Sequence, residues 1–121
     1  MIVDDNHDAG AMLALLVETL GHSVVVKLDA AAALKHAGSQ TADVCLLDIG
    51  LPGMDGYELA RELRIREGTG NSILIAVTGY GQETDRQASA AAGFAHHLVK
   101  PVDVQSLSAI LDAVGGQKAG S

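Results

Sequence analysis

Five polar side chains that are far apart in the sequence could together carry out phosphoryl chemistry. They are three carboxylates, one hydroxyl and one amine: Asp4, Asp5, Asp48, Thr78 and Lys100. Two carboxylates about 5 Å apart repel by roughly 3 kcal/mol at an effective dielectric of about 20, so a cluster of three is expected to bind a cation. Because every candidate ligand atom is an oxygen, magnesium is favoured over zinc.

The hydroxyl and the amine would complete such a site. Magnesium in proteins commonly keeps several waters and takes one or two carboxylates together with phosphate oxygens. Lys100 and Thr78 would then hold the remaining phosphate oxygens. Asp48, flanked by the cation and by Lys100, would be placed to attack phosphorus and form an acyl phosphate. The predicted chemistry is therefore phosphoryl transfer to Asp48.

The hydrophobic pattern predicts the elements that position these residues. Short, continuous apolar runs are typical of strands that are covered on both faces. They occur at 2–3, 24–26, 44–47, 73–77 and 98–99. Between them, apolar residues at i, i+3, i+4 and i+7 predict amphipathic helices. These stripes begin at Leu13, Ala30, Gly56 and Leu107, whereas the segment 82–92 shows a weaker pattern.

Capping residues agree with these limits. Asp29, Asp55 and Asp103 are predicted to begin helices, and Gly21, Gly93 and Gly115 are predicted to end them. Strands that alternate with helices predict one α/β domain, a doubly wound five-stranded parallel sheet with helices on both faces. We expect the domain to span residues 1–115 and residues 116–121 to form a disordered tail. In such sheets functional groups gather at the carboxyl ends of the strands, where all five polar residues lie.

Composition excludes several classes of function. The net charge of −7 and an aromatic content of 2% argue against direct binding of nucleic acid. No run of lysine or arginine could bind an anionic membrane, and no apolar stretch approaches the roughly 20 residues of a transmembrane helix. The single cysteine, Cys45, and the lack of a secretory signal predict a cytoplasmic protein.

Four sequence blocks resemble the receiver domains of two-component signalling in both order and spacing. They are Val3-Asp4-Asp5-Asn6, the segment 46–56, Val77-Thr78-Gly79 and Val99-Lys100-Pro101-Val102. The resemblance covers roughly residues 1 to 114. Segments 48–59 and 93–103 look most like the receivers at the ends of hybrid histidine kinases, which predicts that the chain is part of such a kinase.

The resemblance implies a role for each matching residue. Asp48 would accept a phosphoryl group from the phosphohistidine of a histidine kinase core or a histidine phosphotransfer protein. Asp5 would ligate Mg²⁺ (or Mn²⁺) directly, Asp4 largely through water, and Asp48 and the Gly50 carbonyl would be further ligands. Thr78, Lys100 and the backbone N–H groups of Ile49 and Gly79 would hold phosphoryl oxygens. The resemblance also implies the strand order 2-1-3-4-5, a cis bond before Pro101, and a monomer or weak dimer.

One position departs from the family pattern. Receivers commonly carry Tyr or Phe three residues before the lysine, as a ring that moves on phosphorylation, whereas this chain has His97. His97 therefore occupies the switch position, where a histidine ring could still move and its charge could make the switch sensitive to pH.

Two alternatives use similar residues or the same topology. A haloacid-dehalogenase-like phosphohydrolase also has an aspartate nucleophile, but it needs a second acid two residues later, where this chain has Gly50. A flavodoxin-like FMN carrier needs a hydroxyl-rich loop after the first strand, where Asp4 and Asp5 would repel a phosphate. We therefore expect a phospho-acceptor that regulates by changing conformation and that catalyses only its own phosphorylation and dephosphorylation.

Overall fold

The computed structural model describes residues 1–51, 53–79 and 86–119. Its strands are β1 (Ile2–Val3), β2 (Val26–Lys27), β3 (Val44–Asp48), β4 (Ile73–Thr78) and β5 (Phe94–Val99). Its helices are α1 (His7–Thr19), α2 (Ala30–Ala37), α3 (Gly56–Arg64), α4 (Arg86–Ala92) and α5 (Val104–Ala119). Strands and helices alternate along the chain, as the sequence pattern predicted.

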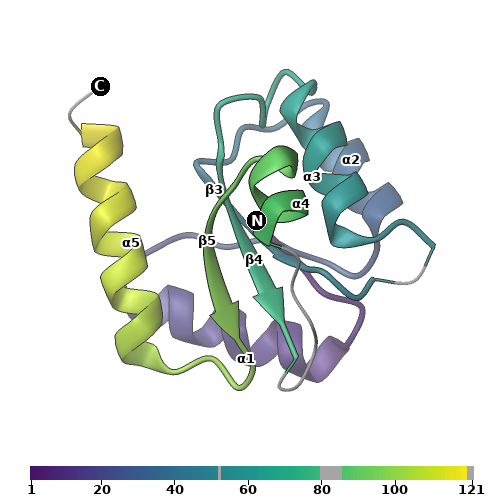
Figure 1. The fold of residues 1–121 in the computed structure, drawn as a ribbon. Coiled ribbons are helices and arrows are strands. Elements are labelled where there is room, and N and C mark those ends of the chain that lie inside the picture. The colour runs from purple at the N-terminus through teal and green to yellow at the C-terminus, as the bar shows by residue number, and fades with distance from the viewer. Residues whose placement is uncertain (52, 80–85, 120–121) are drawn as a thin grey trace.

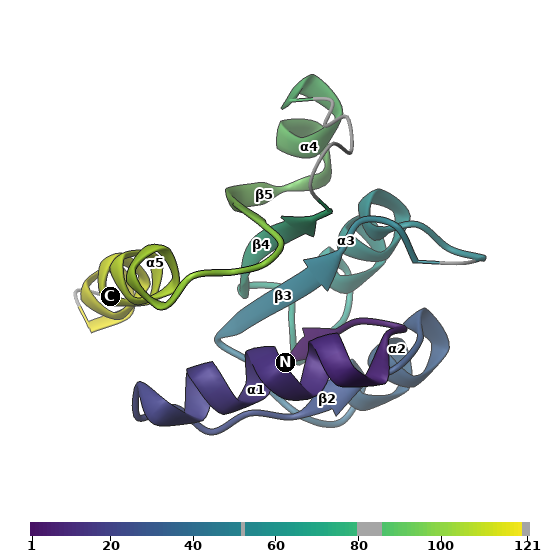
Figure 2. The same ribbon diagram turned by 90° about the horizontal axis from the view of Figure 1, so that it is seen from below.

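The strands form one parallel sheet in the order β2-β1-β3-β4-β5, which confirms the predicted fold and strand order. Helices cover both faces of this sheet (Figure 1). Apolar side chains of α1 and α5 pack on one face, around Leu46, Ile75 and Val77. Those of α2, α3 and α4 pack on the other face (Figure 2), around Leu47 and Ala76. All five of these strand residues are nearly inaccessible to solvent.

Helix caps fix where the helices begin, and those predicted at Asp29, Asp55 and Asp103 are confirmed. Asp29 accepts a hydrogen bond from the Ala32 amide and Asp55 from the Glu58 amide. The Asp103 carboxylate accepts from the Ser106 amide, which lowers the pKa of that carboxyl. Each acidic cap satisfies an amide that the first turn of a helix leaves without a backbone partner.

The observed boundaries correct three predictions. β2 covers Val26–Lys27 instead of 24–26, and β5 begins at Phe94 instead of 98. The apolar pattern missed the first part of β5 because this segment contains polar residues. β5 can contain them because it is an edge strand and partly exposed. α5 continues through Gly115, the predicted stop, to Ala119, so the predicted tail 116–121 begins inside the helix. A glycine inside a helix costs only about 1 kcal/mol relative to alanine and need not end it.

Two helices end at glycines, as predicted for Gly21 and Gly93. Both have positive φ angles, of 94° and 99°, which a residue with a Cβ adopts only with strain. The part of the weak helical pattern at 82–85 lies outside the described residues. Among the described residues, no helix is both long and apolar enough to cross a bilayer.

Candidate functional site

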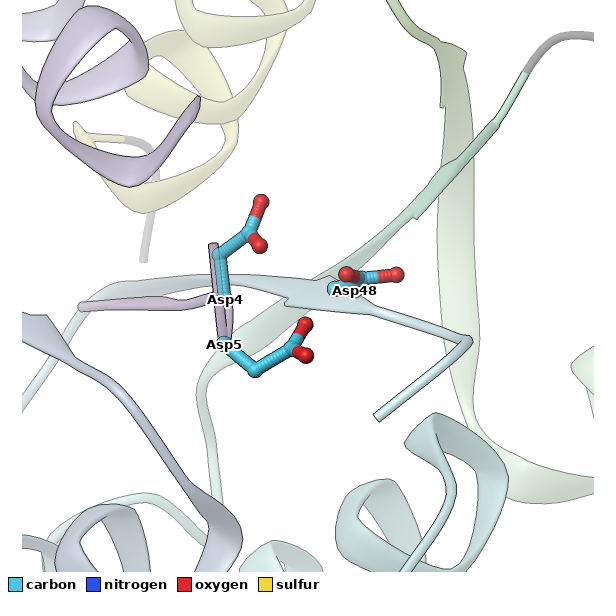
Figure 3. Close-up of side chains that lie close together, drawn as sticks. All are labelled: Asp4, Asp5 and Asp48. Carbon is cyan, nitrogen blue, oxygen red and sulfur yellow. The ribbon is translucent and has the colours of Figure 1, made fainter. Parts of the chain in front are cut away.

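The sheet register brings the three acidic residues together. Val3 pairs with Leu47 across β1 and β3, so Asp4 and Asp48 lie at the ends of adjacent strands. One carboxylate oxygen from each of Asp4, Asp5 and Asp48 lies within 4.8 Å of the other two. Figure 3 shows these side chains beside each other at the end of β3. Asp4 and Asp48 are buried, with 2% and 9% of their surfaces exposed, whereas Asp5 is exposed.

Backbone amides hold one oxygen of each buried carboxylate. Asp4 Oδ1 accepts a hydrogen bond of 2.9 Å from the Asn6 amide, and Asp48 Oδ1 accepts one of 2.9 Å from the Gly50 amide. Both are bonds from an aspartate to the amide two residues later, which stabilise the turn that follows each strand. The cap of α1 is Asn6, whose side chain accepts from the Ala9 amide. Asp4 and Asp5 are therefore not needed to cap that helix.

Lys100 binds the other oxygen of both buried carboxylates. Its Nζ lies 2.8 Å from Asp4 Oδ2 and 3.3 Å from Asp48 Oδ2. Burial alone would lower the pKa of Lys100, but the hydrogen bond to Asp4 and the charge of Asp48 outweigh it and raise the pKa above its usual value. Lys100 is therefore a cation at neutral pH and lies between the two carboxylates.

The backbone around Lys100 is fixed to the neighbouring strand. The Lys100 amide donates a 2.7 Å hydrogen bond to the Thr78 carbonyl, which ties the end of β5 to the end of β4. The bond between Lys100 and Pro101 is cis, which confirms that prediction.

Thr78 lies at the end of β4 and is buried, with 3% of its surface exposed. Its hydroxyl donates a 3.4 Å hydrogen bond to the Leu98 carbonyl. Gly79 follows it directly. β3, which ends at Asp48, therefore has β4 on one side, which supplies the Thr78 hydroxyl. On its other side lies β1, which leads into Asp4 and Asp5.

The Ile49 amide, which the sequence predicts to hold a phosphoryl oxygen, is hydrogen-bonded within the sheet in this structure. The Ile49 amide donates a 3.1 Å hydrogen bond to the Val77 carbonyl, so it extends the ladder between β3 and β4. The amide that contacts Asp48 is that of Gly50, which the sequence had assigned only a carbonyl role. An Asp followed two residues later by Gly at a strand end is a turn signal that could have indicated this bond.

The charges at the site do not balance. Three carboxylates and one ammonium share it, and the surplus of two negative charges lies partly in a buried environment. Only oxygen ligands are present, and the exposed carboxylate of Asp5 leaves one side open to solvent. This combination fits a hard divalent cation that keeps some of its waters.

His97 lies outside this cluster. It is half-buried in β5, and its Nε2 lies 2.5 Å from Ser89 Oγ of α4. Its ring also lies near that of Phe94, with centroids 6.3 Å apart. The assignment of His97 as the switch position stays a prediction.

Comparisons with known proteins agree with this geometry. The family model described as "Response regulator receiver domain" matches residues 1–112. Protein PilH of Pseudomonas aeruginosa is 32% identical over 114 residues, which cover 94% of this chain and 94% of that protein. The CAI-1 autoinducer sensor kinase/phosphatase CqsS of Vibrio cholerae is 34% identical over 104 residues, which cover 85% of this chain and 15% of that protein.

A related solved structure allows the sites themselves to be compared. The receiver domain of a sensor histidine kinase from Pseudomonas aeruginosa PAO1 superposes with a TM-score of 0.83 and 31% identity, over 94% of each chain. That structure has a magnesium ion coordinated in its active-site cleft.

Proposed function

Because the chain belongs to the response regulator receiver family of two-component phosphorelays, we propose that Asp48 is its phosphoryl acceptor. The observation that carries this proposal is the position of the Asp48 carboxylate. The Gly50 amide holds one of its oxygens, Lys100 contacts the other, and the oxygens of Asp4 and Asp5 lie within 4.8 Å. No other carboxylate in the described part of the chain belongs to such a cluster.

Asp4, Asp5 and Asp48 would hold Mg²⁺, with the Gly50 carbonyl as a further ligand. The carboxylate cluster of the chain and the magnesium bound by a related receiver support this assignment. When bound, magnesium offsets negative charge on the phosphoryl oxygens. Mn²⁺ has the same preference for oxygen ligands and would bind as well.

The chain's own residues would position the reacting groups. An oxygen of Asp48 forms a bond to phosphorus while the bond from phosphorus to the imidazole nitrogen of the donor breaks, and the imidazole keeps that electron pair. Lys100 places its positive charge beside the acceptor oxygen and then holds the phosphoryl group. The Thr78 hydroxyl, at the end of the adjacent strand, would turn from Leu98 to a phosphoryl oxygen. Both contacts stabilise charge where it develops.

The donor would be the phosphohistidine of a histidine kinase core or of a histidine phosphotransfer protein. The matches to a sensor kinase and to the receiver of a sensor histidine kinase favour a place within a hybrid histidine kinase. We propose that the domain acts in the cytoplasm as a monomer or weak dimer. Its catalysis would be limited to its own phosphorylation and dephosphorylation.

Incubation with phosphoramidate and MgCl₂, followed by intact-protein mass spectrometry, tests the proposal. We expect a single phosphoryl adduct that requires magnesium and is absent from Asp48→Asn. The matched control is Asp55→Asn, which changes an aspartate in the same loop that only caps α3. Because asparagine also caps helices, this variant should be phosphorylated normally.

Two outcomes would contradict the proposal. The first is an adduct that persists in Asp48→Asn, since the acceptor would then be another residue. The second is sustained hydrolysis of a phosphate ester by the domain alone, which would indicate a phosphohydrolase.

A further inference from the structure

We propose that Ser89 and His97 form a polar latch that fastens α4 to β5 in the unphosphorylated domain and opens on phosphorylation. The latch itself rests on the observed geometry, whereas its coupling to Asp48 rests on the function proposed above. It concerns the position at which this chain has His97 where receivers commonly carry tyrosine or phenylalanine.

The latch joins two elements that border the site. Ser89 lies in the middle of α4, and its side chain is completely buried. Its Oγ lies 2.5 Å from Nε2 of His97 in β5. Figure 1 shows α4 leading into β5 at the edge of the sheet. Phe94 lies on the same face of β5, and its ring contacts both His97 and Tyr57 of α3.

Burial of Ser89 makes this contact energetically important. A hydroxyl that loses its partner inside a protein is destabilising, so movement of the His97 ring away from α4 carries a penalty. A hydroxyl can either donate or accept, so the bond can form with neutral or protonated imidazole.

The backbone connects this latch to the phosphoryl site. The Thr78 hydroxyl donates to the carbonyl of Leu98, the residue that follows His97. At 3.4 Å this hydrogen bond is long and therefore weak. If Thr78 turns to a phosphoryl group on Asp48, the Leu98 carbonyl loses its hydrogen bond from the Thr78 hydroxyl. This loss occurs on β5 next to His97, the residue that Ser89 of α4 contacts. In the proposal, the hydrogen bond from Thr78 to Leu98 and the latch are therefore present in the same conformation.

A quantitative effect follows from this coupling. A net hydrogen bond of typical strength shifts a two-state equilibrium about fivefold. Removal of the Ser89 hydroxyl should favour the open conformation by this factor. In the open conformation Thr78 is available to the phosphoryl group, so phosphorylation by phosphoramidate should be about fivefold faster.

The experiment compares Ser89→Ala with Ser72→Ala. Ser72 is also buried, and its hydroxyl donates a hydrogen bond to the Ala42 carbonyl, at the end of β4 opposite to Thr78. The two variants therefore lose similar interactions, but only Ser89→Ala removes the latch. The readouts are the phosphorylation rate by intact mass and the NMR signal of the His97 ring, assigned by its absence from His97→Phe.

We expect phosphorylation to shift the His97 signal in the wild type and in Ser72→Ala. In unphosphorylated Ser89→Ala the signal should move part of the way toward the phosphorylated position, and phosphorylation should be about fivefold faster. An unchanged signal and rate in Ser89→Ala would overturn the proposal, and so would an equal acceleration in Ser72→Ala. If Ser89→Ala does not fold, His97→Phe keeps a ring without the hydrogen bond and should show the same acceleration.

Failure of the two proposals is distinguishable. If no adduct forms on Asp48 in the wild type, the proposed function is wrong, but the His97 signals of the unphosphorylated variants still test the latch. If the adduct forms and the His97 signal does not move, the coupling is wrong and the acceptor assignment stands.

Discussion

At the residue scale, Lys100 offsets the electrostatic repulsion between two buried carboxylates. Its amine contacts Asp4 Oδ2 and Asp48 Oδ2, and backbone amides hold the remaining oxygen of each acid. Partial burial alone would lower the pKa of Lys100, but the attraction of Asp4 and Asp48 raises it. The same amine repels a divalent cation in the cluster, so it should weaken metal binding while assisting phosphoryl transfer.

This reasoning predicts that Lys100→Met binds magnesium more tightly but is phosphorylated more slowly. Repulsion between a dication and a unit charge at about 5 Å is about 1.7 kcal/mol in a dielectric of about 80, which corresponds to at least tenfold in affinity. Calorimetric titration with MgCl₂ measures the affinity, and phosphoramidate labelling measures the rate. Weaker magnesium binding in Lys100→Met would show that Lys100 organises the ligands instead of repelling the ion.

At the element scale, the start of α3 supports the loop after Asp48. The Gly56 amide donates a hydrogen bond of 3.0 Å to the Ile49 carbonyl. A Cβ at Gly56 would lie 2.6 Å from Ile49 Cα and 2.9 Å from the Asp48 carbonyl oxygen. Only glycine permits this approach of a helix to the backbone that carries the acceptor.

We therefore predict that Gly56→Ala lowers the free energy of unfolding by about 1 to 3 kcal/mol, as overpacking does, and also slows phosphorylation of Asp48. Urea denaturation measures the first effect. The control is Gly38→Ala, because Gly38 has a φ of −72° and a Cβ there would make only ordinary contacts. Its stability should stay the same or rise by up to about 1 kcal/mol. Equal losses in both variants would mean that the contact with the loop is not the cause.

At the scale of the whole molecule, the acidic cluster adds to an overall net charge of −7. Repulsion among these charges opposes the folded state, and three of the carboxylates lie together at one edge of the sheet. A cation that binds this edge only in the folded protein must stabilise the fold by mass action.

Magnesium at one hundred times its dissociation constant should therefore raise the free energy of unfolding by about 2.7 kcal/mol. Sodium chloride at equal ionic strength should give a smaller increase, because it only screens charge. Urea denaturation of Asp5→Asn, which loses one carboxylate of the cluster, should show little difference between the two salts. Asp55→Asn should behave like the wild type. A magnesium effect that survives in Asp5→Asn would place the ion elsewhere.

The sequence by itself determined which residues end the strands and that these ends meet. Strand and helix periodicities are local properties, and parallel topology places all carboxyl ends at one edge, so Asp4, Asp48, Thr78 and Lys100 could be grouped before any coordinates. The local pattern gave wrong boundaries where tertiary packing sets the length of an element. β5 is longer than its apolar run, and α5 continues past Gly115.

Only the tertiary structure decided how these groups pair. The register of β1 on β3 sets which carboxylates are neighbours, and the position of β5 sets which oxygens Lys100 reaches. Two further contacts are likewise visible only in three dimensions. They are the hydrogen bond from the Ile49 amide to the Val77 carbonyl and the contact between Ser89 and His97. The physical reason is that each contact joins separate elements and depends on sub-ångström placement, which no local pattern of residues encodes.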